Sequence, residues 1–202
     1  MQPVTELLNA TESTAIAQAV QAIRRGELVV FPTDTLYGVG VDAFNETAVN
    51  KLYAAKQRSF SKGIPILLAD LSDLEKVVTA VPDLAQRLIE KHWPGPLTII
   101  VPKATHLPAN LSPNEGIAVR IPDHTAGRAF IRAAGGALAT SSANLSGRPP
   151  ATTAAAALAQ LNGIAAVILD DGPSPQQVAS TIVSFLGPAP VIVRQGPLTI
   201  SV

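Results

Sequence analysis

The decisive stretch of this sequence is Leu28-Val29-Val30-Phe31-Pro32-Thr33-Asp34-Thr35-Leu36-Tyr37-Gly38-Val39-Gly40. A short apolar run stops at the proline, and two hydroxyl groups, a carboxylate, a phenol and two glycines follow it. Open α/β sheets present ligand sites where a buried strand ends in polar residues. The stretch therefore predicts a strand at 28–31 with a ligand site at its end. Taken alone, its polar residues are better explained as a hydroxyl-rich turn or a helix cap.

A basic cluster follows at Lys56-Gln57-Arg58-Ser59-Phe60-Ser61-Lys62-Gly63. Lys56 and Arg58 fall near the predicted end of a helix, where cations interact favourably with the helix dipole. Lys62 lies beyond that helix, so the dipole does not explain it. Three cations so close together are suited to neutralise a polyphosphate. The two stretches together predict a small polar substrate beside a phosphate-bearing one.

The composition indicates a compact folded domain. At 202 residues the chain is long enough to bury a sizeable core, and we treat residues 1–202 as a single domain. Hydrophobic residues make up 47% and charged residues 15%, which argues against disorder. Fifteen basic residues balance fifteen acidic ones. The chain therefore lacks the overall field that drives non-specific nucleic-acid binding, although a local basic patch remains open.

Several classes of site are excluded by residue type. The sequence contains no cysteine, which removes disulfides, thiolate zinc sites and cysteine nucleophiles and is compatible with a reducing cytoplasm. His92, His106 and His124 are scattered without metal-ligand spacing, so we expect no protein metal site. No signal peptide is evident, and no apolar run approaches the ~20 residues that cross a bilayer. We therefore expect a cytoplasmic protein without membrane contact.

Helical and strand patterns alternate along most of the chain, with more strand towards the end. This alternation predicts an α/β fold with a mixed sheet. Ser72-Asp73-Leu74-Glu75 has the pattern of a capping box that opens a helix, and the proline-rich segment 102–113 is the best candidate for a flexible loop. Further helices are expected at 13–25, 45–56, from 82 to the Trp93-Pro94 break, 123–134 and 153–161, and strands at 28–31, 64–68, 97–101, 117–121, 137–140, 166–169, 181–186 and 191–193.

The common nucleotide-binding motifs do not occur. There is no G-x-x-x-x-G-K-[ST] loop, and Gly38-Val39-Gly40 lacks the third glycine of a dinucleotide fingerprint. No G-x-S-x-G elbow is present either. Any nucleotide must therefore be held by other means.

Arg120 lies in the apolar run Ile117-Ala118-Val119-Arg120-Ile121. Residues 117, 119 and 121 share one face of the predicted strand, so the arginine lies on the other face with Ala118. A cation in so apolar a strand needs an anionic partner. An intramolecular Asp or Glu is the default partner, and a substrate carboxylate is the sharper alternative.

Polar residues also end other apolar runs. The segment Ala139-Thr140-Ser141-Ser142-Ala143-Asn144 offers neutral hydrogen-bonding groups that can hold a carboxylate, a phosphate oxygen or a base edge. Ser180 and Arg194 repeat the theme near the carboxyl end. Each is explained singly as a turn, but so many polar strand ends in one small sheet predict a shared site.

As a set, these residues resemble the YrdC-type L-threonylcarbamoyladenylate synthases, in the short form without a carboxyl-terminal domain. The resemblance runs from about residue 13 to 199. It rests on Phe31-Pro32-Thr33-Asp34-Thr35-Leu36-Tyr37-Gly38, Lys56-x-Arg58, Trp93-Pro94-Gly95-Pro96-Leu97-Thr98, Val119-Arg120-Ile121-Pro122, Ser142-Ala143-Asn144, Ser180-Thr181-Ile182 and Arg194-x-Gly196. It implies an open, twisted α/β sheet around a positively charged cavity.

The resemblance also implies a reaction. Such enzymes combine L-threonine, bicarbonate and ATP into threonylcarbamoyl-AMP and pyrophosphate. Other proteins then transfer the threonylcarbamoyl group to adenosine 37 of ANN-decoding tRNAs. Mg²⁺ is expected to arrive with ATP rather than in a protein cage. Without a covalent nucleophile, catalysis would rest on position and electrostatics.

The family's roles carry over onto matching residues of this chain. Lys56 and Arg58 would be catalytic and, with Lys62, would gather the ATP phosphates and bicarbonate. Thr33, Arg120, Thr140 and Ser180 would bind threonine, with Arg120 on its carboxylate, and Ser142, Asn144 and Arg194 would hold the nucleotide.

Three departures from the family pattern concern the shape of loops. Ser59 stands where proline often follows the K-x-R arginine, Ala179 where an acidic residue often precedes the Ser-Thr pair, and Gln195 where proline is usual. Two other functions therefore stay open. One is a non-catalytic module that binds tRNA or double-stranded RNA, and the other is a paralogue that acts on another carbamoyl-type substrate.

Overall fold

The computed structural model describes residues 4–200 and places ten strands in one sheet, in the order β1-β8-β2-β3-β7-β4-β6-β5-β9-β10. Parallel and antiparallel neighbours alternate irregularly along this order, so the predicted mixed sheet is confirmed. The strands are β1 (Glu6–Asn9), β2 (Val29–Phe31), β3 (Gly38–Asp42), β4 (Ile66–Leu68), β5 (Leu97–Pro102), β6 (Gly116–Arg120), β7 (Ala137–Ser142), β8 (Val167–Asp170), β9 (Thr181–Ser184) and β10 (Val191–Arg194).

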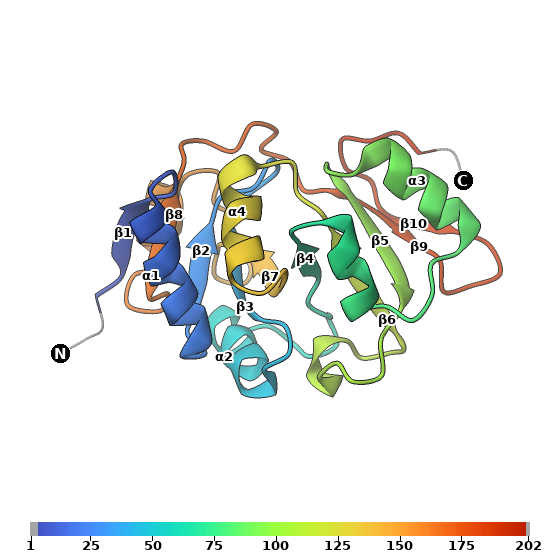
Figure 1. Cartoon of the computed structure of the whole chain (residues 1–202), viewed down its shortest axis with the longest axis horizontal. Coiled ribbons are helices and arrows are strands. Elements are labelled where there is room, and N and C mark those ends of the chain that lie inside the picture. Colours follow the sequence, from blue (N-terminus) through green and yellow to red (C-terminus); the bar gives the residue numbers. More distant parts are fainter. Residues whose placement is uncertain (1–3, 201–202) are drawn as a thin grey trace.

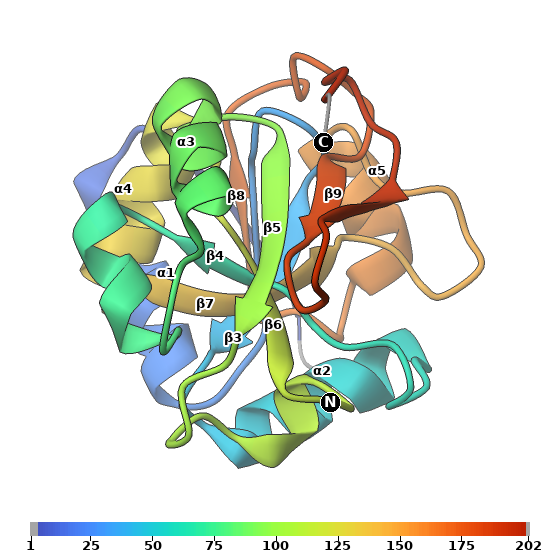
Figure 2. The same cartoon turned by 90° about the vertical axis from the view of Figure 1, so that its right-hand side faces the viewer.

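Helices cover both faces of the twisted sheet, as Figures 1 and 2 show. α1 and α4 pack together over one face, where Phe31 meets Phe130 at a ring-centroid distance of 5.3 Å. The larger core lies on the other face and includes residues of α2 and α5. The helices are α1 (Ser13–Arg24), α2 (Glu46–Lys56), α3 (Asp83–His92), α4 (Thr125–Ala133) and α5 (Ala154–Leu161), with short 3-10 helices η1 (Leu71–Lys76) and η2 (Ala109–Leu111).

Local sequence explains where α2 begins and ends. The Asn45 side chain accepts a hydrogen bond of 3.0 Å from the Ala48 amide, which caps the first turn. Gln57 ends the helix in the left-handed region at φ 50°. The end of α2 therefore delivers Lys56 and Arg58 to the 57–63 turn, as the sequence predicted.

Two strands were not predicted from the sequence, and one expectation was wrong. Residues 38–42 form the buried strand β3, because Gly38 and Gly40 allow close approach to β7: a Cβ at Gly38 would lie 2.8 Å from the Thr140 methyl carbon. The strand at 6–9 was missed, because its largely exposed residues carry little apolar signal. The capping box is formed by Asp70 and Asp73 rather than Ser72 and Glu75, and it opens a 3-10 helix.

The chain crosses the molecule once more after β8. In Figure 1, β8 lies on the left, whereas β9 and β10 lie on the right beside β5. Two backbone hydrogen bonds hold the connection between β8 and β9 against the rest of the fold. The Gln176 amide donates to the Asp34 carbonyl at 2.9 Å, and the Ser174 amide donates to the Thr152 carbonyl at 2.8 Å. This crossing brings Ser180 and Arg194 close to the polar turn that follows β2. Among residues 4–200, no helix is long and apolar enough to cross a bilayer.

Candidate functional site

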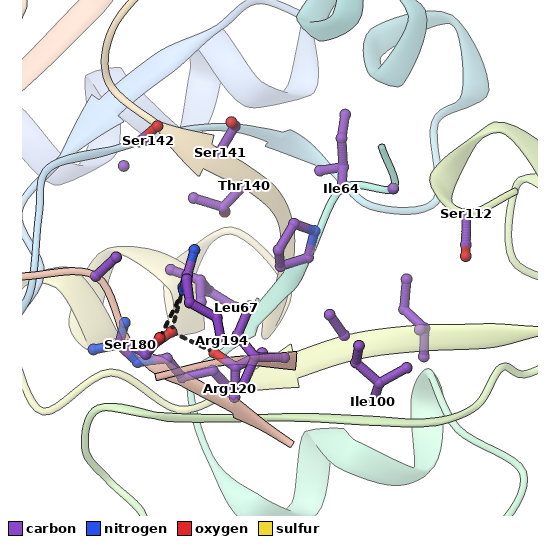
Figure 3. Close-up of a pocket in the computed structure, with 18 of the residues that line it drawn as sticks. Ile64, Leu67, Ile100, Ser112, Arg120, Thr140, Ser141, Ser142, Ser180 and Arg194 are labelled. Atoms are coloured by element: carbon purple, nitrogen blue, oxygen red, sulfur yellow. Dashed lines mark hydrogen bonds between the residues drawn. The ribbon is translucent and has the colours of Figure 1, made fainter. Parts of the chain in front are cut away.

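A cavity of about 640 Å³ opens where the polar strand ends meet. Figure 3 shows Arg120, Ser180 and Arg194 gathered at one end, Thr140, Ser141 and Ser142 along another side, and Ser112 far from both. Of the predicted site residues, eight line the cavity: Thr33, Arg58, Arg120, Thr140, Ser142, Asn144, Ser180 and Arg194. The structure therefore brings together residues that are up to 161 positions apart, since Thr33 and Arg194 both belong to the wall.

The hydroxyl of Thr33 is used within its own turn. It donates to the Leu36 carbonyl at 2.6 Å and accepts the amides of Thr35 and Leu36, each at 3.2 Å. This is the turn-stabilising role that such residues take in loops. Thr33 still lines the cavity, so its contact with threonine stays a prediction.

Arg120 is 5% exposed and has an internal counter-ion, Asp34, whose carboxylate accepts from its Nη2. Its Nη1 donates to the Thr35 hydroxyl at 2.7 Å and its Nε to the Gly95 carbonyl at 2.8 Å. Burial lowers the pKa of Arg120, and the Asp34 charge opposes that effect. The default partner expected from the sequence is therefore present. A substrate carboxylate would have to use the guanidinium hydrogens that remain.

Arg194, Ser180 and Thr98 form a second polar group at the same end of the cavity. Arg194 donates from Nε to the Ser180 carbonyl at 2.9 Å and from Nη2 to the Ser180 hydroxyl at 3.0 Å. The Ser180 hydroxyl oxygen lies 2.7 Å from that of Thr98, on β5. Burial lowers the pKa of Arg194. Sequence reasoning missed Thr98 as a site residue, although it ends the Trp93–Thr98 motif.

Lys56 does not line the cavity itself, and its side chain contacts the turn at the end of β7. Its Nζ donates to the carbonyls of Ser142 and Asn144, the latter at 2.6 Å, and to Asn144 Oδ1 at 3.0 Å. The side chain is 3% exposed, and burial lowers its pKa to about 8. The ammonium thus holds the Ser142–Asn144 turn in place. A direct contact with phosphate stays a prediction.

The other two cations of the basic cluster differ in position. Arg58 lines the cavity, and its guanidinium is fixed by the carbonyls of Lys62 at 2.9 Å and Gly63 at 2.8 Å. The Lys62 side chain is exposed and lies outside the lining. The structure therefore separates residues that the sequence grouped as one phosphate site.

The described residues do not provide a set of side chains that could hold a metal ion without a substrate. Among residues 4–200, no three His, Cys, Asp or Glu side chains cluster as metal ligands, and the cavity lining contains no carboxylate side chain. Mg²⁺ prefers carboxylates together with substrate phosphates. The wall would therefore fit Mg²⁺ through a bound nucleotide, which stays a prediction, as does the positive charge of the cavity.

The family model described as "Telomere recombination", Sua5_yciO_yrdC, matches residues 21–196. A Mycobacterium tuberculosis H37Rv protein, provisionally named a threonylcarbamoyl-AMP synthase, is 42% identical over 188 residues, which cover 93% of this chain and 86% of that protein. The Bacillus subtilis threonylcarbamoyl-AMP synthase is 41% identical over 201 residues, which cover 97% of this chain and 57% of that protein.

The chain is also similar to solved structures of Sua5 and YciO proteins. Sua5 of Pyrococcus abyssi, determined with L-threonine, superposes with a TM-score of 0.92 at 33% identity. The match covers 96% of this chain and 58% of that one, so this chain spans little more than half of its longer relatives. YciO of E. coli superposes with a TM-score of 0.83 at 24% identity, which supports the fold alone.

Proposed function

The chain belongs to the Sua5/YciO/YrdC family, and from this premise we propose that it is a threonylcarbamoyl-AMP synthase. The reaction would convert L-threonine, bicarbonate and ATP into threonylcarbamoyl-AMP and pyrophosphate. One observation carries the proposal. Arg58, Arg120 and Arg194 meet a set of hydroxyl groups in one cavity whose lining, within residues 4–200, has no carboxylate side chain. Such a wall suits substrates that bring their own negative charge.

The threonine would occupy the end of the cavity near Arg120 and Ser180. Both side chains lie there with Arg194, and Thr35 and Thr140 also belong to the cavity lining. Arg120 keeps guanidinium hydrogens beyond those that bind Asp34, Thr35 and Gly95. A carboxylate placed there would be held by charge-assisted hydrogen bonds.

The nucleotide would lie along Arg58, Arg194 and the Ser142–Asn144 turn. Threonine's amine would first add to bicarbonate with loss of water, which gives N-carboxy-threonine. One oxygen of this new carboxylate would attack the α-phosphorus of ATP, and pyrophosphate would leave. The arginines would stabilise charge on the phosphates, and Lys56 would keep the turn in position. Mg²⁺ bound to ATP would add charge neutralisation.

The wider setting is part of the same proposal. Threonylcarbamoyl-AMP is an activated mixed anhydride, so a transfer protein must consume it, with tRNA as the final acceptor. Action in the cytoplasm agrees with that setting and with the sequence expectation. The match covers no more than about 58% of the longer relatives' own length, so the proposal is limited to the chemistry of this cavity.

The test is to incubate the protein with ATP, bicarbonate and each amino acid in turn. We expect pyrophosphate release that depends on both threonine and bicarbonate, and a threonylcarbamoyl-AMP product detected by mass spectrometry. Release with another amino acid would instead favour the paralogue. Salt-sensitive RNA binding without any adenylate product would favour the RNA-binding module.

A further inference from the structure

Thr98 and Ser180 form a buried hydroxyl pair beside the cavity. Thr98 lies on β5 and Ser180 immediately before β9, the parallel neighbour of β5. Their hydroxyl oxygens are 2.7 Å apart, and the two residues are 3% and 4% exposed. Both line the cavity. Nothing in the threonine and ATP roles already described accounts for Thr98.

The hydrogens of this pair can be counted. Each hydroxyl has one hydrogen and two acceptor positions. Arg194 already fills one acceptor position of Ser180, at 3.0 Å. Thr98 makes no hydrogen bond from its side chain to any other residue within 4–200. One hydroxyl must donate to the other, so one hydrogen of the pair is left without a protein acceptor.

The surroundings decide how that hydrogen can be used. If Thr98 donates to Ser180, both acceptor positions of Ser180 are filled, and its own hydrogen is free to point into the cavity. The adjacent Arg194 guanidinium favours an anionic oxygen at that position. No carboxylate side chain of the described lining competes for it. A free hydroxyl hydrogen beside a cation is therefore suited to a ligand carboxylate.

We propose that Thr98 is a positioning residue, which donates to Ser180 and so directs the Ser180 hydroxyl hydrogen to the carboxylate of the amino-acid substrate. The inference rests on the proposed function, because it assigns that carboxylate to the Arg120 and Ser180 end of the cavity. Thr98 touches the substrate carboxylate only through Ser180. Its removal should weaken threonine binding and leave ATP binding unchanged.

Thr98→Val removes the hydroxyl and keeps the branched shape. We expect the KM for L-threonine to rise at least about fivefold, the effect of one lost neutral hydrogen bond that directs the Ser180 hydroxyl, while the KM for ATP and kcat stay within about twofold. Thr98→Ser restores the hydroxyl without the methyl group and should return the threonine KM to within about threefold of wild type. Calorimetric binding of L-threonine should follow the same order.

Thr5→Val is the matched control for stability. Thr5 is also a buried threonine, and its hydroxyl donates to the Ala165 carbonyl at 2.6 Å, outside the cavity lining. Its removal should lower the melting temperature without changing the threonine KM. A general loss of stability is thereby distinguished from a loss of positioning.

Ser180→Ala completes a double-mutant cycle. If Thr98 acts through Ser180, adding Thr98→Val to Ser180→Ala should change threonine affinity by less than about twofold. Additive losses, an equal rise in the ATP and threonine KM, or a Thr98→Val variant indistinguishable from wild type would each overturn the inference and leave the proposed function standing. A wild-type protein that neither binds threonine nor releases pyrophosphate would overturn both.

Discussion

Neutralising Asp34 should destabilise the whole fold, because this carboxylate is the counter-ion of Arg120. The two residues are 3% and 5% exposed. The carboxylate also accepts the Asp123 amide at 3.1 Å and the Gln176 side chain at 3.4 Å. Asp34→Asn keeps the shape but removes the charge, which leaves a buried guanidinium without its anion.

Breaking a buried ion pair from one side typically costs about 3–5 kcal/mol. Asparagine retains one acceptor oxygen, so we expect the lower end, about 3 kcal/mol of unfolding free energy. For a chain of this length, that corresponds to a fall in melting temperature of roughly 6–12 °C. Urea unfolding followed by circular dichroism measures the first quantity, and calorimetry the second.

The control is Glu27→Gln, which removes the exposed pair between Arg25 and Glu27, with side chains 59% and 38% exposed. Its melting temperature should stay that of wild type, since exposed pairs contribute little. Arg120→Gln combined with Asp34→Asn should lose less than the sum of the single variants, because neither charge is then left alone. The reasoning is refuted if Asp34→Asn is no less stable than Glu27→Gln.

Four further predictions concern the cavity and the residues that support it. Lys56→Ala should abolish threonine-dependent pyrophosphate release in a folded protein, and full turnover would exclude a role for this side chain. In the folded state the pKa of Lys56 is lowered from 10.5 to about 8, so the unfolded state binds more protons between these two pH values. The unfolding free energy of wild type, compared with that of Lys56→Met, should therefore rise between about pH 8 and pH 10.5. Urea titrations at several pH values measure this difference. Arg58→Gln should raise the KM for ATP at least about tenfold, whereas Lys62→Gln should change it less than about twofold. The reason is that Arg58 lines the cavity and Lys62 does not. Equal effects of the two variants would contradict this assignment. Gly38→Ala should cost about 1–3 kcal/mol in urea unfolding, since its Cβ would lie 2.8 Å from the Thr140 methyl carbon, and a wild-type midpoint would show that β3 and β7 can move apart.

The sequence predicted the elements whose periodicity and caps are local. α3 is an example: it begins at Asp83 and ends at His92, before the Trp93-Pro94 break, as expected. β3 could not be recognised from the sequence, because glycines at positions 38 and 40 are compatible both with a flexible turn and with a tightly packed strand. The difference lies in Thr140, a partner on β7 that is about 100 residues away.

The sequence predicted that distant polar residues gather at one place, but not their detailed contacts. Eight of the site residues predicted from the sequence line one cavity. The sequence left open whether Thr33 bonds within its own turn and which carboxylate neutralises Arg120, and it did not predict that Lys56 turns towards the Ser142–Asn144 carbonyls. These depend on side-chain direction at the ends of elements, where a small rotation exchanges a ligand contact for an internal one.

The late return of the chain to β5 has a consequence for synthesis. Until β9 is made, β5 has an unpaired edge, and its buried residues Leu97, Ile99 and Val101 lack part of their cover. An open apolar edge is prone to pairing with other chains. A growing polypeptide that has not yet reached Ser180 would therefore lack part of its cavity wall and be open to aggregation. A complete cavity therefore requires the chain through Arg194, the last of its lining residues.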